Sequence, residues 1–586
     1  MAETRTKLAA GLLALLLAGC ATTEETRPAA SPVSVKIIAF NDFHGNLQPP
    51  GQSVAAAGQG GATVRVPAGG AAYLASAIER LRSSNANNAV VSAGDMIGAS
   101  PLVSALFLDE PTIHAMNLIR VDFNAVGNHE FDRGRAELLR MQNGGCEQHT
   151  AREPCRLDRD FAGARFRFLA ANVVTETGET LFPAYGIRSY GSGAGEVRVA
   201  FIGMTLRETP TLVTPAGVAG LTFRDEAETV NALIPRLRAE GADAIVVLIH
   251  QGLSTNVGYN DPSCGGIEGD LLPVLARLDP EVDVVVSGHT HNAYVCDYAR
   301  IDPSRPFLVT SAGRYGTLVT DVTLDIDPAS GVVSRRAENV IVQSEPQPNA
   351  PLSERYPAFP PNAAVQALVA RYSVAAAPLA SRVVGRLSGD ALREALPSGE
   401  SVLGDLIADA QLAATAPSQA GGAQIAFMNS GGVRADLRRE PDSTVTYGRI
   451  FTSQPFGNIL VVKSFTGRQI RQALEQQFST GPDGRGATRI MLYPSRGFTF
   501  AYDLTRPQGQ RIVDMRLNGQ PIRDDAIYRV TINSFLSTGG DAFTVFRDGT
   551  EALGGPLDLD ALEAYFQSAD PLTPPAADRI RNVTPQ

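Results

Sequence analysis

Short, almost wholly apolar runs alternate with helical stretches between residues 35 and 325, and this alternation limits the fold more than any other feature. Helical stretches such as 71–82 and 229–239 lie between the runs. A strand that is apolar on both faces must be covered on both faces, as in sheets that helices enclose. The sequence therefore predicts an α/β first domain at 34–343. The runs that we expect to form its strands are 35–40, 89–92, 123–126, 168–172, 197–204, 244–249, 282–287 and 307–310.

A proline-rich segment, residues 344–362, follows this domain. Its composition is typical of a linker, and a helical stretch comes next, so we expect a linker and linking helix at 344–380. A second domain is predicted at 381–582. Residues 48–70 are rich in Gly, Ala and Gln, and we expect a flexible loop there. The helices expected in the second domain are 403–414 and 467–478, and its strands are 424–428, 459–465, 497–503 and 528–532.

The first twenty residues resemble a bacterial lipoprotein signal. A basic N-terminus precedes an apolar run at 8–18, whose 11 residues are too few to span a bilayer, which needs about 20. The run ends in Leu17-Ala18-Gly19-Cys20, which looks like a lipobox. We expect a lipoprotein signal peptide at 1–20, a lipid on Cys20 and a tether at 21–33. The protein would be exported and anchored by this lipid alone, to the outer membrane facing the periplasm or at the cell surface. The alternative is a plain signal peptide in which Cys20 is incidental.

Export changes what the remaining cysteines imply. Cys146, Cys155, Cys264 and Cys296 are an even number, and an oxidising compartment favours disulfides. Three pairings are open, and free buried thiols are the alternative. We favour Cys146–Cys155, which closes a short local loop, together with Cys264–Cys296. No CxxC spacing suggests a zinc site.

The charge balance argues against nucleic acid as a partner. The formal net charge is −10, and no long Lys/Arg run occurs. A negative protein that handles phosphates needs local positive charge, from metals or from a few arginines.

Aspartate and histidine gather in five short motifs at, or just after, the ends of the expected strands. The carboxyl ends of strands in α/β sheets are where ligands bind, so these motifs can converge on one site. Five of the seven histidines lie in them, and we interpret His114 and His149 as structural. The motifs are Asn41-Asp42-Phe43-His44-Gly45, Ala93-Gly94-Asp95, Gly127-Asn128-His129-Glu130-Phe131-Asp132, Ile249-His250-Gln251-Gly252 and Ser287-Gly288-His289-Thr290-His291.

These residue types suit divalent metal ions. Aspartate and histidine bind zinc, manganese or iron without any cysteine. The two-residue step from Asp42 to His44 puts both side chains on one side of the chain, and His289 and His291 repeat it. Asp95 can bridge two ions about 3.5–4 Å apart. A single motif could be a turn or a surface pair, but all five in order predict a two-metal site.

The order D-x-H, G-D, G-N-H-E, H and G-H-x-H resembles the calcineurin-like metallophosphoesterase signature, and GNHEFD resembles its 5′-nucleotidase branch. This resemblance implies a four-layered α/β/β/α sandwich with a second, α+β substrate-binding domain, and two divalent metal ions (zinc, manganese or similar). His129 and Asp132 would be the catalytic dyad. One ion would be bound by Asp42, His44, Asp95 and His291, and the other by Asp95, Asn128, His250 and His289.

The second domain carries the same resemblance. Arg434 ends the Gly-rich turn that starts at Asn429, and an arginine fork suits phosphate oxygens. Phe456 and Phe535 lie on loops and could clamp a flat base, while Asp541 could accept hydrogen bonds from ribose hydroxyls. The alternative is that both phenylalanines are core and Asp541 is a turn residue. The resemblance also implies substrate contacts for Asn128, Asn429 and Arg393.

We therefore expect a metal-dependent 5′-nucleotidase that releases phosphate from 5′-nucleotides, with cleavage of UDP-sugars or other nucleotide pyrophosphates open at the same site. One alternative is a 2′,3′-cyclic-nucleotide phosphodiesterase/3′-nucleotidase. Another is a nucleotide-binding lipoprotein without catalysis. The expected partner is a small-molecule nucleotide, and we expect a monomer.

Overall fold

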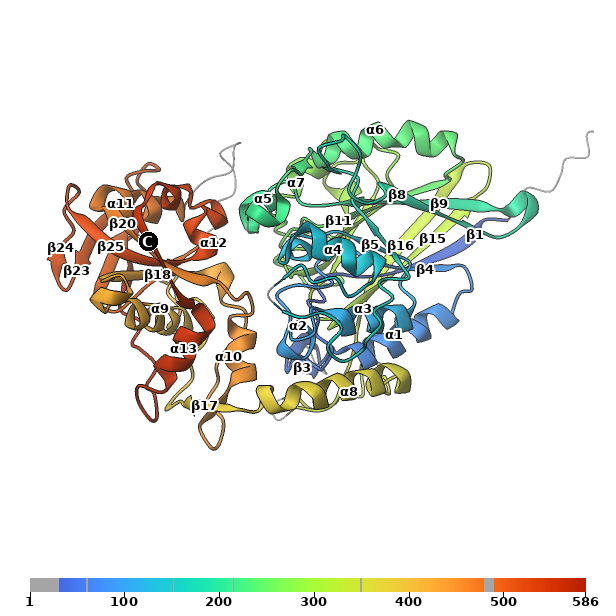
Figure 1. Cartoon of the computed structure of the whole chain (residues 1–586). Helices are drawn as coiled ribbons and strands as arrows, with labels where there is room; N and C mark the ends of the chain where they lie inside the picture. Colours follow the sequence, from blue (N-terminus) through green and yellow to red (C-terminus); the bar gives the residue numbers. More distant parts are fainter. Residues whose placement is uncertain are drawn as a thin grey trace, which may run out of the picture.

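The computed structural model describes residues 31–585 except 59–61, 151, 214, 348–349 and 479–489. The predicted signal peptide, the lipidated Cys20 and most of the predicted tether lie outside the described residues. The described chain forms two bodies, and the long helix α8 (Ala363–Ala380) lies along one side of the first and leads into the second (Figure 1).

Two six-stranded sheets form the centre of the first domain. The strand order of the first sheet is β16-β15-β1-β4-β5-β6, and its last four strands are parallel. The order of the second is β13-β14-β12-β11-β9-β8, with parallel pairing from β14 to β9. The first sheet consists of β1 (Val33–Phe40), β4 (Asn88–Ser92), β5 (Phe123–Ala125), β6 (Arg167–Leu169), β15 (Leu318–Asp327) and β16 (Gly331–Ile341). The second consists of β8 (Tyr185–Tyr190), β9 (Val197–Met204), β11 (Ala244–Ile249), β12 (Val284–Ser287), β13 (Ala293–Asp297) and β14 (Leu308–Ala312).

Alternation along the strands explains why these sheets stack. On β1, Val35 and Ile37 point to one face and share a core with Phe201 of the second sheet. Ile38 points to the opposite face, where helices α1 (Ala71–Ser83) and α3 (Glu110–Ile119) cover it. On β9, Ile202 faces away from the first sheet, toward α6 (Glu226–Ala239). The four layers are therefore helix, sheet, sheet and helix, which confirms the predicted fold class.

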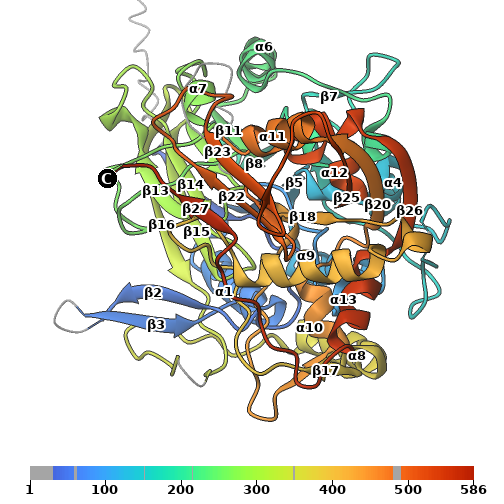
Figure 2. The same cartoon turned by 90° about the vertical axis from the view of Figure 1, so that its left-hand side faces the viewer.

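The segment 48–70 forms a β-hairpin, so the expectation of a flexible loop was wrong. β2 (Ser53–Ala57) pairs antiparallel with β3 (Thr63–Pro67), and the hairpin stands out from the domain (Figure 2). Buried Ala56 and Val66 pack into the core, which a composition rich in Gly and Ala does not reveal. The proline-rich segment fixes the hairpin, since Arg355 donates a hydrogen bond to the carbonyl of Gly58.

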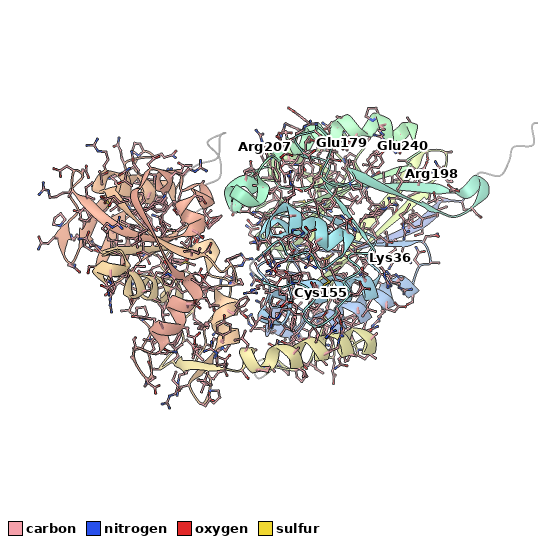
Figure 3. The ribbon with its side chains drawn as sticks, viewed as in Figure 1. Lys36, Cys155, Glu179, Arg198, Arg207 and Glu240 are labelled. Atoms are coloured by element: carbon pink, nitrogen blue, oxygen red, sulfur yellow. A yellow bond between two sulfur atoms is a disulfide. The ribbon has the colours of Figure 1, made fainter. Side chains whose placement is uncertain are left out.

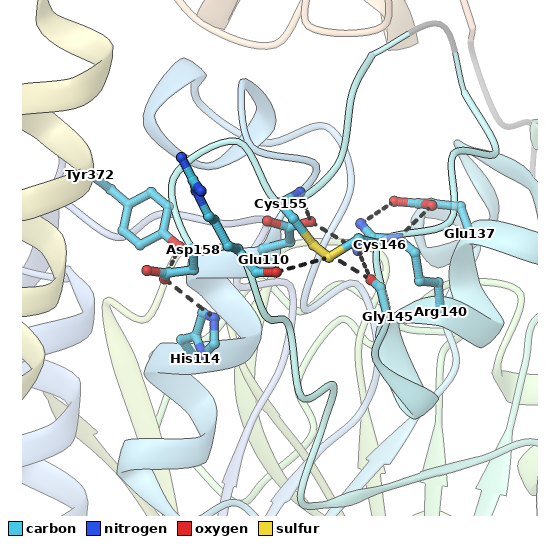
Figure 4. Close-up of a disulfide and its surroundings, with 10 residues drawn as sticks. Glu110, His114, Glu137, Arg140, Gly145, Cys146, Cys155, Asp158 and Tyr372 are labelled. Atoms are coloured by element: carbon cyan, nitrogen blue, oxygen red, sulfur yellow. Dashed lines mark hydrogen bonds and ion pairs between the residues drawn. A yellow bond between two sulfur atoms is a disulfide. The ribbon is translucent and has the colours of Figure 1, made fainter.

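Both disulfides that the sequence favoured are present, Cys146–Cys155 and Cys264–Cys296. The segment that follows the first disulfide also fastens α8 to the first domain (Figure 4). Its Asp158 accepts a hydrogen bond of 2.6 Å from the hydroxyl of Tyr372, a fully buried residue of α8. By length and composition α8 could cross a membrane. Because Tyr372 and Ala376 pack on the first domain and folded chain lies on either side of α8, we assign it to the fold.

The second domain joins helices to two small sheets. The larger sheet has the order β21-β18-β25-β20-β26 and the smaller β24-β23-β22-β27. Helix α11 begins with a capping box between Thr466 and Gln469, which explains its sharp start. The main helices are α9 (Val402–Thr415), α10 (Tyr447–Ser453), α11 (Gly467–Gln476) and α13 (Asp558–Phe566). The strands are β17 (Val383–Arg386), β18 (Ile425–Asn429), β19 (Thr444–Thr446), β20 (Ile459–Thr466), β21 (Leu492–Pro494), β22 (Phe498–Tyr502), β23 (Ile512–Leu517), β24 (Gln520–Pro521), β25 (Ile527–Asn533), β26 (Thr550–Leu557) and β27 (Ile580–Asn582).

Charged side chains on the outer face of the first domain are largely paired with one another. Arg198 and Glu240 are both exposed there (Figure 3). Arg198 lies 3.2 Å from Glu196, and Glu240 lies 2.9 Å from Arg236. Each of these two arginines therefore has a carboxylate partner beside it.

Candidate two-metal active site

Seven polar side chains meet at the carboxyl ends of the parallel strands of both sheets. Asp42 and His44 follow β1, Asp95 follows β4 and Asn128 follows β5. From the second sheet, His250 follows β11, and His289 and His291 follow β12. The stacked sheets present these loops at the same edge, so residues up to 249 positions apart in the chain become neighbours.

One cluster consists of Asp42, His44 and His291. The Nε2 atoms of the two histidines lie 3.1 Å apart, and Nε2 of His291 lies 3.3 Å from Oδ1 of Asp42. The other ring nitrogen of His44 contacts the carbonyl of Gly98 at 3.0 Å, which leaves Nε2 directed into the cluster. Burial opposes charge on Asp42, yet His291 and His250 lower its pKa to about 2, so it is a carboxylate.

A second cluster consists of Asp95, His250 and His289, with Asn128 beside it. The amide oxygen of Asn128 lies 3.1 Å from both His250 Nε2 and His289 Nδ1. Burial and the neighbouring His250 lower the pKa of His289 to about 3, so its ring is neutral and carries a free lone pair. Oδ2 of Asp95 lies 3.0 Å from His250 Nε2 and 3.6 Å from His44 Nε2, which places this carboxylate between the clusters.

The donor set fits two divalent ions. The ligand atoms of each cluster, carboxylate oxygens and imidazole nitrogens, lie within 4.8 Å of one another, and such a grouping of acceptors is stabilised by a cation. Their backbone is also unusual, because five of these non-glycine residues have positive φ, a region that L-residues adopt at a cost. The five are Asp42 (49°), His44 (46°), Asp95 (50°), His289 (70°) and His291 (61°).

Glu130 holds the Asp95 loop in place, a role that the sequence argument missed. Its carboxylate accepts hydrogen bonds from the backbone N–H groups of Asp95 (2.9 Å), Met96 (2.8 Å) and Gly127 (2.7 Å). The side chain is 3% exposed. Its place in GNHE, next to the proposed dyad, is the signal that could have found it.

His129 and Asp132 are in contact beside the clusters. His129 Nδ1 lies 2.9 and 3.0 Å from the two carboxylate oxygens of Asp132, and Asp132 also accepts from the N–H of Ala99 at 3.0 Å. Burial lowers the pKa of His129, but Asp132 and Asp95 outweigh it and the net shift is upward. The ring of His129 stacks on Phe456 of the second domain, with centroids 5.7 Å apart.

A cavity of about 230 Å³ lies between the two domains, next to this dyad. From the second domain Asn429, Arg434, Phe456, Phe535 and Asp541 line it, and from the first Asn128, His129, Asp132 and His289. Neither phenylalanine is buried in a core, in contrast to the alternative expectation.

A hydrogen-bond chain fixes the polar floor of this cavity. Asn533 donates to the amide oxygen of Asn429 (2.9 Å), and the Asn429 amide donates to Asp541 (2.7 Å). Asp541 has φ of +53°, so its placement is strained, and burial raises its pKa to about 6. Phe535 stands against Gly540, where a Cβ atom would lie 2.5 Å from the ring.

Two further arginines lie near the clusters. Arg393 does not line the cavity; it lies behind Arg434 and donates to its backbone carbonyl at 3.0 Å. Arg314, to which no sequence motif pointed, follows β14 and precedes Tyr315. The ring of Tyr315 meets that of His291 edge-on, with centroids 5.7 Å apart. His114 and His149 lie elsewhere, within 3.7 Å of Asp158 and 3.8 Å of Glu147 respectively.

Comparisons with known proteins agree with this geometry. The calcineurin-like phosphoesterase model matches residues 35–293, and the model of the 5′-nucleotidase C-terminal domain matches 383–548. Endonuclease YhcR of Bacillus subtilis is 31% identical over 545 residues, which are 92% of this chain and 40% of YhcR. Cell wall protein Lmo0130 of Listeria monocytogenes is 30% identical over 546 residues, 89% of this chain and 65% of Lmo0130. The chain thus spans less than two thirds of these two relatives.

The crystal structure of the 5′-nucleotidase precursor from Thermus thermophilus has the same fold. Its TM-score is 0.73 at 26% identity, covering 94% of this chain and 100% of that one. With both domain models matched in this order and two candidate metal clusters in place, the chain belongs to the 5′-nucleotidase family of calcineurin-like metallophosphoesterases, enzymes that use two divalent metal ions.

Proposed function

We propose that this chain is a 5′-nucleotidase that hydrolyses nucleoside 5′-monophosphates to nucleoside and phosphate. The observation that carries the proposal is the cavity between the domains. Its lining combines His129 and Asn128 of the first domain with Phe535 and Asp541 of the second. A phosphate and a nucleoside can therefore be bound together in one cavity.

The first domain would supply the reaction chemistry. Asp42, His44, Asp95 and His291 would hold one ion, and Asp95, Asn128, His250 and His289 the other. When bound, the two ions supply Lewis acidity toward the phosphate and the attacking water. His129, charged and oriented by Asp132, faces the phosphoryl group and can stabilise its oxygens or give a proton to the leaving oxygen.

The second domain would supply recognition. Arg434 would present its guanidinium to phosphate oxygens. The Cζ atom of Arg434 lies 6.0 Å from the centre of the Phe456 ring. Phe456 and Phe535 offer aromatic faces to the base. Asn429 and Asp541, held together by their hydrogen bond, offer polar groups to the ribose. Arg393 would act through Arg434 rather than by contact with a monophosphate.

Two other functions fit parts of the site. A 2′,3′-cyclic-nucleotide phosphodiesterase/3′-nucleotidase would use the same metal ligands, but the two phenylalanine loops and Asp541, which line one cavity with the dyad, favour the 5′ assignment. A binding protein without catalysis has no use for the His129–Asp132 pair. Nucleotide pyrophosphates remain compatible with the site.

The protein is exported, as its two disulfides and its cell-wall relative indicate. We further propose that Cys20 carries a lipid that anchors it to the outer membrane facing the periplasm, or at the cell surface, and that it acts as a monomer. The domain limits that we propose are 34–343 and 381–582, joined by 344–380.

The test uses residues 21–586 with Cys20→Ser. Phosphate release is measured from AMP, 3′-AMP and 2′,3′-cyclic AMP with manganese or zinc, and again with chelator and with Asp95→Asn. Metal-dependent release from AMP that the variant loses is the expected result. Turnover of the 3′ or cyclic substrates in preference to AMP would reject the 5′ assignment, and no turnover at all would reject catalysis.

A further inference from the structure

Lys463 is a buried lysine of β20, and its ammonium contacts two backbone carbonyls of the second domain. The residue is 8% exposed. Nζ donates to the carbonyl of Ser537 at 3.0 Å and to that of Phe546 at 2.9 Å. Within the part of the chain that the structure describes, no carboxylate oxygen lies within 4.0 Å of Nζ. Burial lowers the pKa of Lys463, because the charged form loses its contact with water. Two carbonyls rather than an ion pair therefore stabilise this buried charge.

The first carbonyl lies at the end of the short helix that carries Phe535. This helix is α12 (Ser534–Ser537), and β20 passes beside it (Figure 2). The side chain of Asn533 caps the start of α12. The last carbonyls of a helix have no partner inside it. Lys463 supplies such a partner at Ser537 and so fixes the other end of the helix.

The second carbonyl belongs to the 3₁₀ helix η9 (Thr544–Asp548), which is anchored in the core of the domain. Phe546 is 1% exposed, and its ring meets that of Phe465 edge-on, with centroids 5.6 Å apart. Phe465 lies on β20, two residues from Lys463. Strand β20 therefore holds η9 by packing and holds the end of α12 by the ammonium.

The turn between these two fixed points has a strained backbone and carries Asp541. Gly539, Asp541 and Ala542 have φ of +87°, +53° and +63°. Residues other than glycine adopt this region at a cost, and such a backbone persists only where its surroundings hold it. Lys463 bridges the two sides of the turn. Without that bridge we expect the turn to relax, and Phe535 and Asp541 to move with it.

We infer that Lys463 is a positioning residue for the nucleoside, because it holds Phe535 and Asp541 in the arrangement that a base and a ribose require. The inference rests on the proposed function, in which these two residues contact the nucleoside. Lys463 is not among the described residues that line the cavity between the domains. It therefore acts through the segment that it bridges. Phosphate binding, which involves the metal clusters and Arg434, does not depend on this bridge.

The experiment measures nucleoside binding and phosphate binding separately on the metal-loaded protein. Lys463→Met preserves an unbranched side chain and removes both hydrogen bonds, while Lys463→Gln is a second variant that keeps an NH₂ donor. Initial rates with AMP give kcat and KM, and competitive inhibition by inorganic phosphate gives its Ki. We expect KM for AMP to rise about tenfold in Lys463→Met, because the base loses a well-placed stacking partner. The value of kcat should stay within about threefold of the wild type and the phosphate Ki within about twofold, and Lys463→Gln should show a smaller rise in KM.

Arg529→Met is the matched control. Arg529 lies on β25, the neighbouring strand of the same sheet. Its guanidinium likewise joins two backbone carbonyls, those of Gly421 (3.0 Å) and Glu551 (2.9 Å). Neither carbonyl belongs to the segment 535–546. The control should therefore keep the wild-type KM for AMP, even where its thermal unfolding midpoint falls.

The outcomes separate this inference from the proposed function. A wild-type KM for AMP in both Lys463 variants would overturn the inference. Equal rises in the AMP KM and the phosphate Ki would also overturn it, because they would indicate a general distortion of the site. A rise in KM of the same size in Arg529→Met would count against it for the same reason. A wild type that does not cleave AMP would instead reject the proposed function.

Discussion

Replacement of Glu130 by glutamine tests whether the metal site depends on the residues behind it. Glu130 accepts three backbone N–H groups, two of them through Oε2 and that of Met96 through Oε1. Glutamine keeps one oxygen and replaces the other by an NH₂ group. In its better orientation it still accepts from Asp95 and Gly127, but its NH₂ then faces the N–H of Met96.

The expected loss of loop stability follows from the hydrogen bonds that the substitution changes. One charge-assisted hydrogen bond is lost and a buried donor is left unpaired, which destabilises the loop by about 2–4 kcal/mol. Asp95 is the carboxylate between the two clusters, and the orientation of its side chain depends on the loop that Glu130 holds. Loss of such a support lowers metal affinity by roughly 10–100-fold.

The assay is calorimetric titration of metal-free protein with Mn²⁺ at pH 8, alongside AMP turnover. Glu226→Gln is the matched control, because Glu226 is 4% exposed and accepts a backbone N–H from Arg207 at 2.8 Å on the far side of the second sheet. Mn²⁺ affinity of Glu130→Gln within twofold of the wild type would refute the reasoning, as would an equal loss in the control.

Four other changes have defined outcomes. Asp132→Asn removes the group that keeps His129 charged and oriented, so kcat for AMP should fall about 10²–10³-fold with little change in KM; a change confined to KM would contradict this role. Phe535→Ala should raise KM for AMP about 5–50-fold, because the base loses one aromatic ring on which it stacks. Initial rates measure this KM, and an unchanged value would mean that the base binds elsewhere. Burial raises the pKa of Asp558 to about 7 from 3.8, so the folded chain keeps a proton that the unfolded chain releases in that interval. The wild type should therefore lose about 4 kcal/mol of stability as pH rises from 3.8 to 7, and Asp558→Asn should not; urea unfolding at pH 5 and 8 checks this slope. Removal of the metal by a chelator should lower the thermal unfolding midpoint of the wild type and hardly change that of Asp95→Asn, as measured by scanning calorimetry. Equal shifts in the two proteins would mean that the chelated ion lies elsewhere.

The sequence was informative wherever one physical requirement dominated. Strands buried on both faces must be almost wholly apolar, so 197–204, with Arg198 as its one charged residue, and 244–249 could be placed to the residue. The hairpin at 53–67 could not, because small residues such as Ala56 pack only through contacts that lie far away in the chain. The ends of the other predicted helices and strands differ from the observed ends by one to three residues.

The candidate site divides in the same way. The Asp and His residues that follow the strands converge because the sheet topology brings the strand ends together. The residue types and their positions after strands are therefore enough to predict a shared metal site. Glu130 and Arg314 were missed because their roles come from backbone groups and charges supplied by other loops. Arg393 stays a predicted substrate contact; it lies behind Arg434 and donates to its backbone carbonyl at 3.0 Å.

The strained backbone of the ligands connects these observations. Five ligand residues with positive φ, at about 1–3 kcal/mol each, together cost as much as the whole stability of a typical domain, about 5–15 kcal/mol. Such strain persists only where the surroundings over-determine it. Here Asp42 is held through Tyr315 and Asn41, Asp95 through Glu130, and His289 through its N–H bond to Asp42 at 2.9 Å. Because these supports come from both sheets, the packing of the two sheets is itself a condition of the site. Hydrogen bonds supplied by both sheets thus help to position the candidate ligand side chains.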